Sequence, residues 1–247
     1  MNYLNSIEQK ELVAWVDLTT HCNAGCPQCH RTNINGLGKV DWLPLTQWSI
    51  DDFKNVFSLD DIKHISKFEI CGTWGDPFMA KDIFEILKYI IENSNCTIQI
   101  NTNGGMRNPE FWKKIGELSL KRMQVIFDIE GITEEMHNHY RRKVSLKKLK
   151  ENIKAYTDVG GNALAHIIVF KHNENHIMDI LNMCYGELGV TSHVIQASNR
   201  FHSDGKLEFI DENGQLAILE EVENKNNPLL NKTIAPLRDH EWKRKNL

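Results

Sequence analysis

Short apolar runs alternate along the chain with segments in which apolar residues recur every three or four positions. The short runs are rich in β-branched residues and predict strands at 13–18, 68–71, 97–100, 123–129, 163–170 and 190–195. The periodic segments predict helices at 49–57, 81–93, 111–118, 145–159 and 174–185. Strands that alternate with helices predict an α/β fold built on a parallel sheet with right-handed crossovers.

The number of repeating units limits the architecture. Six strand-and-helix units are too few for the usual closed barrel of eight, so we expect an open, partial (β/α)6 barrel. Residues 1–198 form this core in our prediction, and residues 199–247 form a C-terminal capping segment. We expect one helix at 212–223 in the cap, packing against the barrel through residue 230, and a mobile end at 243–247.

Composition narrows the class of protein. The 247 residues include 29 basic and 33 acidic side chains, a net charge of −4 that does not indicate a nucleic-acid partner. The sequence contains no run of about 18 apolar residues, so we expect no membrane span. The polar start of the chain does not resemble a signal peptide. We therefore expect a cytoplasmic protein, a setting in which clustered thiols usually bind metal or take part in catalysis.

Three of the six cysteines fall within eight residues, at Cys22, Cys26 and Cys29. Gly25 and Pro27 suit a loop that curls round one point. A structural zinc site needs four ligands, so a neighbouring histidine would have to complete it. An iron–sulfur cluster is also held by thiolates, and three cysteines on a four-iron cluster leave one iron open. Three unliganded thiols are the third possibility, although their proximity would invite oxidation.

The C-x3-C-x2-C spacing of these cysteines resembles the signature of the radical S-adenosylmethionine (radical SAM) superfamily. The resemblance implies a [4Fe–4S] cluster on Cys22, Cys26 and Cys29, with S-adenosylmethionine chelating the fourth iron. It also implies a partial barrel, an external electron donor of the flavodoxin or ferredoxin type, and a 5′-deoxyadenosyl radical that abstracts hydrogen from a substrate.

Unusual residues follow every predicted strand, where parallel α/β folds place their chemistry. The loops begin with Cys71, Asn101, Asp128, Lys171 and Gln196 after the second to sixth strands. The second loop resembles the family's Gly-Gly-Glu-Pro motif, and two later segments resemble Ser-x-Asp-Gly and His-x-x-Tyr-Arg stretches of the peptide-modifying (SPASM-like) branch. The resemblance implies these cofactor-binding residues: Gln28, Gly72, Trp74, Gly75, Asp76, Asn103, Asp128 and Arg141.

Several alternatives stay open at this point. The other three cysteines are dispersed, so we expect no auxiliary cluster of the kind that many peptide-modifying relatives carry. A peptide or protein side chain is the first substrate expected, a small metabolite or nucleotide the second, and a tRNA the third. The hypothesis from another class is a non-catalytic zinc-binding α/β module. A side chain added at Gly75 is expected to weaken cofactor binding more than folding.

Overall fold

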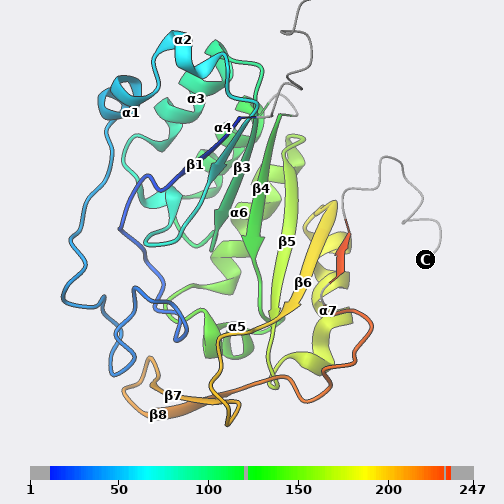
Figure 1. Ribbon diagram of the computed structural model, residues 1–247. Coiled ribbons are helices and arrows are strands. Elements are labelled where there is room, and N and C mark those ends of the chain that lie inside the picture. The colour runs from blue at the N-terminus through cyan, green and yellow to red at the C-terminus, as the bar shows by residue number, and fades with distance from the viewer. Residues whose placement is uncertain (1–11, 120–121, 231, 235–247) are drawn as a thin grey trace, which may run out of the picture.

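The computed structural model describes residues 12–119, 122–230 and 232–234, so the predicted mobile end at 243–247 lies outside the described residues. Six parallel strands run in chain order across one sheet, which Figure 1 shows from the side. They are β1 (Val13–Val16), β2 (Lys67–Ile70), β3 (Thr97–Thr102), β4 (Met123–Asp128), β5 (Asn162–Val169) and β6 (Ser192–Ala197). All six predicted strands are confirmed, each with bounds within two residues of the prediction.

The helices also follow the predicted pattern. They are α1 (Ile50–Val56), α2 (Leu59–Ile62), α3 (Ile83–Asn93), α4 (Pro109–Leu118), α5 (Glu134–Tyr140), α6 (Leu146–Asp158) and α7 (Ile177–Asn182). Ser49 and Asp52 form the capping box that begins α1, and Asn108 caps α4 ahead of Pro109. Short helical turns at Glu174–His176 and Met183–Glu187 flank α7, so the predicted helix at 174–185 is divided into three pieces. Helices α2 and α5 were not predicted.

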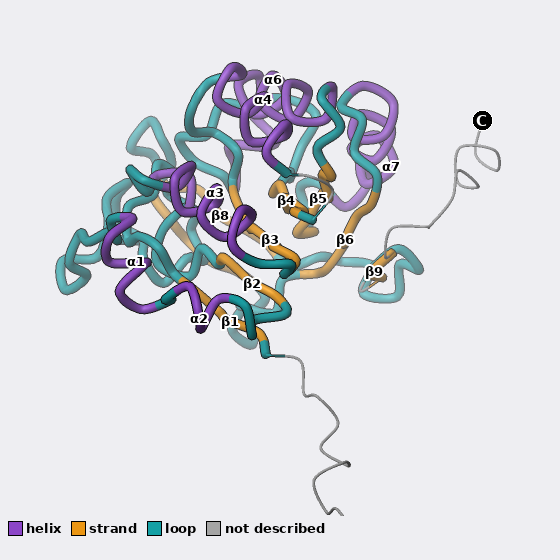
Figure 2. Tube along the Cα trace, turned by 90° about the horizontal axis from the view of Figure 1, so that it is seen from above, coloured by secondary structure: helices purple, strands orange, loops and turns teal. Residues whose placement is uncertain are grey.

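The sheet has an apolar face and a polar face. One row of neighbouring residues, at most 5% exposed, lies on the helix side: Val16, Ile70, Ile100, Val125 and Ala163. The adjacent row lies on the other side: Trp15, Glu69, Gln99 and Gln124. Figure 2 shows the strands as an arc with the helices outside it and the inner side open. The open partial barrel is therefore confirmed, and the row of Glu69, Gln99 and Gln124 makes this part of its inner wall polar.

The segment after β6 corrects one prediction. Instead of a helix at 212–223, the chain forms an antiparallel hairpin of β7 (Lys206–Ile210) and β8 (Leu216–Glu220). The turn contains Asn213 and Gly214, and Gly214 has a φ of +78° that favours glycine. Alternation along the strands places Phe209 and Leu219 in the interior, at 2% and 0% exposed.

The hairpin lies below the carboxyl ends of the parallel strands (Figure 1). After it, Val222 and Leu230 join the main core, and β9 (Lys232–Ile234) pairs antiparallel with β6. The segment through residue 230 thus packs on the barrel, as expected. No helix among the described residues is long and apolar enough to cross a membrane.

Candidate active site

A cavity of about 540 Å³ lies at the carboxyl ends of the strands. Every one of the six parallel strands contributes a residue to its wall, either from the strand itself or from the loop that follows. The lining comprises Cys22, Ala24, Cys26, Cys29, His30, Cys71, Gly72, Thr73, Gly75, Asp76, Asn101, Thr102, Asn103, Asp128, Tyr140, Arg141, His166, Ile168, Gln196, Ala197, Ser198, Asn199 and Arg200. The topology therefore brings together residues that lie as far apart in the sequence as Cys22 and Arg200.

Tight turns shape the cysteine loop. The backbone N–H of Cys29 donates to the Cys26 carbonyl (3.1 Å), and that of Thr32 donates to the Cys29 carbonyl (2.9 Å). The N–H of Gly25 donates to the carbonyl of Arg142 (3.0 Å), whose own side chain is fully buried and donates to the Gly25 carbonyl. These contacts curl the loop so that all three thiols of the triplet face the same cavity.

The thiols lie close enough to influence one another. Burial raises the pKa of Cys26 to about 11, and it raises the pKa of Cys22 further. Hydrogen-bond donors nevertheless approach both sulfurs: the Ala24 N–H and Asn103 Nδ2 approach Cys22 Sγ, and Arg141 Nη1 approaches Cys26 Sγ (3.6 Å).

Metal-bound thiols must lose their protons, and buried thiolates need positive charge beside them. The N–H groups of Ala24 and Asn103 and the guanidinium of Arg141 supply part of that positive charge. The irons of a cluster would supply the rest. The residues therefore fit an iron–sulfur cluster. Among the described residues, no three Cys, His, Asp or Glu side chains meet closely enough to hold a single metal ion.

The glycines after β2 allow two backbone segments to touch. A Cβ at Gly75 would lie 2.2 Å from the Thr19 carbonyl oxygen and 2.6 Å from that of His21. A Cβ at Gly72 would lie 2.6 Å from the carbonyl oxygen of Gly75. The close approach locks this loop against the end of β1, so the same glycines shape the cavity wall.

Asp76 is 3% exposed and acts within this loop. Its carboxylate accepts from the backbone N–H groups of Phe78 (3.0 Å) and Asn103 (2.8 Å) and from the Thr102 hydroxyl. Burial raises its pKa to about 6. Asn103 in turn exchanges hydrogen bonds with the amide of Asn23 in the cysteine loop. Asp76 thus couples the loops after β2 and β3, and Asn103 couples the latter to the cysteines.

A buried charge network crosses the other side of the cavity. Arg141 donates twice to Glu130 (2.7 and 2.9 Å) and also pairs with Asp128 (3.1 Å). The second oxygen of Asp128 lies 2.7 Å from Nδ1 of His166. Both predicted residues, Asp128 and Arg141, reach the cavity, but each is already engaged by the other.

Two predicted cofactor-binding residues lie outside the cavity lining. The Gln28 side chain accepts from the Ser198 hydroxyl (2.6 Å), and its amide nitrogen has no partner. Trp74 packs edge-on against Trp42, with ring centroids 5.4 Å apart. Gln28 therefore lies behind Ser198 of the wall, whereas Trp74 is half-buried against the exposed ring of Trp42.

The sequence interpretation missed His166, Ile168 and Arg200. His166 and Ile168 lie within β5 rather than after it, whereas Lys171 pairs with Glu220 and Glu223 away from the cavity. A histidine inside the apolar run at 163–170 was the available signal. Arg200 donates to the Gln28 carbonyl (3.1 Å).

Comparisons with known proteins agree with this geometry. An AdoMet-dependent heme synthase of Methanosarcina barkeri is 27% identical over 130 residues, covering 53% of this chain and 34% of the relative. A GTP 3′,8-cyclase of Aquifex aeolicus is 23% identical over 199 residues, which cover 78% of this chain and 58% of the relative. The chain thus spans about one third to three fifths of the length of these curated relatives.

Solved structures share the fold. The SuiB protein of Streptococcus suis bound to S-adenosylmethionine superposes with a TM-score of 0.60 at 13% identity, over 78% of this chain and 42% of SuiB. The anSMEcpe protein with bound AdoMet superposes with a TM-score of 0.56 at 14% identity, over 75% of this chain and 51% of anSMEcpe. The family model of the radical SAM superfamily matches residues 16–184. The chain therefore belongs to the radical SAM superfamily, whose members use a [4Fe–4S] cluster and S-adenosylmethionine.

Proposed function

We propose that this chain is a radical SAM enzyme that abstracts hydrogen from a peptide or protein side chain. The observation that carries the proposal is the convergence of Cys22, Cys26 and Cys29 on a cavity walled by all six strand ends. When bound there, the cluster and S-adenosylmethionine supply a 5′-deoxyadenosyl radical.

The chain's own residues hold and shield the reactants in this proposal. Cys22, Cys26 and Cys29 would hold three irons, and Asn103 and Arg141 would stabilise the charge on the sulfurs. Gly75 and Asp76 keep the loop after β2 against the cysteine loop, which leaves its backbone for the methionine moiety. Phe209 and Leu219 of the hairpin pack in one apolar cluster with Cys26 and keep water from that side.

A peptide substrate is supported by the open inner wall of the sheet. Trp15 is 73% exposed there, and the polar residues Glu69, Gln99 and Gln124 lie beside it. A long polar surface with an aromatic rim can contact several residues of an extended chain. The structural neighbours include SuiB bound to its precursor peptide SuiA.

A small molecule is the second candidate. Two curated relatives are named a heme synthase and a GTP 3′,8-cyclase, and the cavity of about 540 Å³ is of the size that encloses small ligands. In either case an external flavodoxin or ferredoxin would supply the electron. The predicted cytoplasmic location stays a prediction.

The cluster can be tested by metal analysis of anaerobically purified protein. We expect about four irons and four sulfides per chain, a brown colour, and reductive cleavage of S-adenosylmethionine. Cys26→Ala should lose the iron and the cleavage, while Cys96→Ala, the matched control in the main core, should retain both. One zinc per chain in a colourless wild-type protein, or full iron in Cys26→Ala, would contradict the proposal.

A further inference from the structure

His166 stands apart from the other charged residues of the cavity. It lies on β5 with its side chain toward the inner wall, and its neighbours in register are Asp128 on β4 and Val194 on β6. Its Nδ1 is 2.7 Å from Asp128. Its Nε2 has no hydrogen bond within the described part of the chain and is not among the buried unpartnered atoms. One ring nitrogen is therefore fixed, and the other faces the cavity.

The network behind His166 favours a positively charged imidazole. Two carboxylates, Asp128 and Glu130, share the single guanidinium of Arg141. The hydrogen bond and the charge of the Asp128 carboxylate raise the pKa of His166 against the effect of burial. The groups facing it are Asp128 on β4, Glu130 after β4 and Arg141 at the end of α5.

The side of the cavity next to His166 presents further donors. Gln196, Asn199 and Arg200 line it from β6 and the residues that follow. Arg200 forms no ion pair with any residue that the structure describes, and one of its nitrogens donates to the Gln28 carbonyl. Among the described residues that line this side of the cavity, Asp128 carries the one carboxylate, and both of its oxygens are engaged.

We propose that His166, held in place by Asp128, binds a carboxylate group of the substrate. This rests on the proposed function and gives it a substrate class: molecules, peptides included, that carry a carboxylate near the carbon that loses hydrogen. The same geometry reassigns the role expected of Asp128. Because its oxygens are occupied, Asp128 orients the imidazole instead of contacting the ligand, and His166 presents the free N–H.

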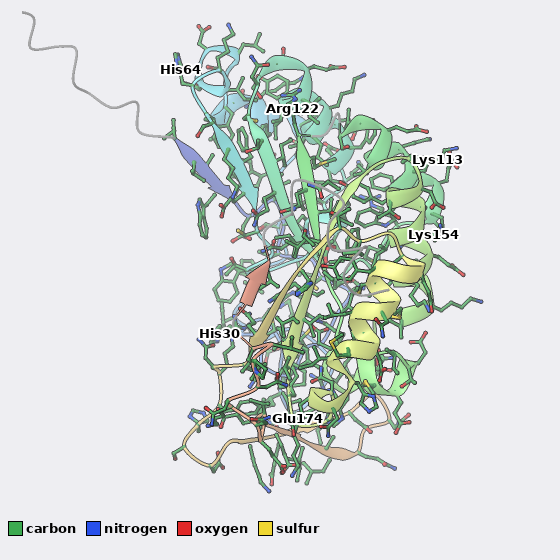
Figure 3. The ribbon with its side chains drawn as sticks, turned by 90° about the vertical axis from the view of Figure 1, so that its right-hand side faces the viewer. His30, His64, Lys113, Arg122, Lys154 and Glu174 are labelled. Atoms are coloured by element: carbon green, nitrogen blue, oxygen red, sulfur yellow. The ribbon has the colours of Figure 1, made fainter. Side chains whose placement is uncertain are left out.

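The test uses chemical footprinting of the anaerobic holoenzyme. Diethyl pyrocarbonate acylates the unprotonated form of accessible imidazoles, so peptide mass spectrometry is used to obtain a rate for each histidine at several pH values, from neutral to mildly alkaline. The exposed His64 serves as the internal reference. Figure 3 shows it near the top of the view, whereas His30, which lines the cavity, lies in the lower half. S-adenosylmethionine is kept saturating, so that its own carboxylate site is filled. N-acetylglycine is the carboxylate probe.

We expect His166 to react in the presence of S-adenosylmethionine and to be slowed at least fivefold by N-acetylglycine, in a saturable manner. The rate at His64 should not change. N-acetylglycinamide, which lacks the carboxylate, should give no protection. In Asp128→Asn the protection should disappear, because the imidazole loses its proton at neutral pH.

Three results would overturn the proposal. The first is complete protection of His166 by S-adenosylmethionine alone, which would make it a cofactor residue. The second is equal protection by the acid and the amide. The third is no reaction at His166 at any of the pH values at which His64 reacts. If Asp128→Asn does not fold, the pH dependence in the wild type decides: the His166 rate must rise at a pH above about 6.5, the ordinary pKa of an imidazole. Iron content of the same samples reports separately on the proposed function.

Discussion

Gly75 lies where the loop after β2 passes against the end of β1. The nearest atoms to an added Cβ belong to the backbone, the carbonyls of Thr19 and His21, and cannot rotate away. The motif suggested that Gly75 leaves space for a cofactor. The structure gives a different reason, because a side chain at this position would collide with the backbone after β1.

Gly75→Ala should therefore lower both stability and cofactor affinity. We expect a loss of about 1–3 kcal/mol in the free energy of unfolding, the usual cost of a forced overlap, together with weaker S-adenosylmethionine binding. Thermal unfolding and calorimetry measure the two effects. Gly36→Ala is the control, since nothing lies within 4 Å of its added Cβ. Weak binding at unchanged stability would restore the cofactor-space explanation.

His137 of α5 is fully buried, and its protonation links stability to pH. Its Nδ1 accepts from the backbone N–H of Glu130 (3.3 Å), and its Nε2 has no partner among the described residues. Burial lowers its pKa to about 3. In the unfolded chain His137 therefore binds a proton near pH 6.5, whereas in the folded protein it stays neutral until about pH 3. The folded protein consequently loses stability as the pH falls below about 6.5.

We expect this histidine to remove about 1.4 kcal/mol of stability between pH 7.5 and 5.5. His137→Asn keeps an acceptor for Glu130 but does not titrate, so its free energy of unfolding should depend less on pH by that amount. Anaerobic urea unfolding at several pH values measures the slope. Equal slopes in wild type and His137→Asn would show that His137 does not contribute.

At the scale of elements, periodicity predicted the long elements and failed where turn chemistry decides. The strands and the helices α3, α4 and α6 follow apolar spacing. In the hairpin and just after it, Leu216, Leu219 and Val222 recur every three positions, as in a helix, and the Asn213–Gly214 turn is the signal that favours a hairpin instead. The short helix α5 has few apolar residues, so its Thr133 cap was its main signal.

The hairpin β7–β8 covers the cysteine loop, so its interior residues should protect the cluster. Phe209→Ala should cost about 3–5 kcal/mol of stability and should speed loss of iron in air, because Phe209 packs in the cluster that contains Ala24 and Cys26. Absorbance of the cluster after exposure to air measures the second effect. Ile218→Ala, on the same hairpin but 43% exposed, should change neither quantity. Equal decay in both variants would show that the hairpin does not shield the cluster.

At the scale of the whole molecule, the site could be predicted in part. Residues that form contiguous motifs, such as Cys22, Cys26 and Cys29, were found because their spacing is local. His166 was not, because its meeting with Asp128 depends on the register of β4 and β5, two strands joined through α5 and α6. Likewise, the engagement of Arg141 by two carboxylates could not be read from the sequence, which implied Arg141 only as a cofactor-binding residue.

The capping segment after β6 belongs to the core of the molecule. Val222 and Leu230 are buried in the main core, and Phe209 and Leu219 are buried beside the cysteines. Each large apolar side chain contributes about 1.5–3 kcal/mol when buried. Four of them together approach the whole stability of a typical domain, roughly 5–15 kcal/mol. The barrel and its cap should therefore fold as one unit.

A chain that ends at Arg200 should consequently aggregate or unfold and should bind no cluster. Removal of residues 243–247 alone, which lie outside the described residues, should leave unfolding temperature and iron content unchanged and is the matched control. A chain that ends at Ile234 keeps the hairpin, Leu230 and β9, and should behave like the full chain. Solubility, circular dichroism and iron content of the three variants measure the effect. A soluble, iron-loaded fragment ending at Arg200 would show that the barrel folds without its cap, and would leave the hairpin free for contact with a partner.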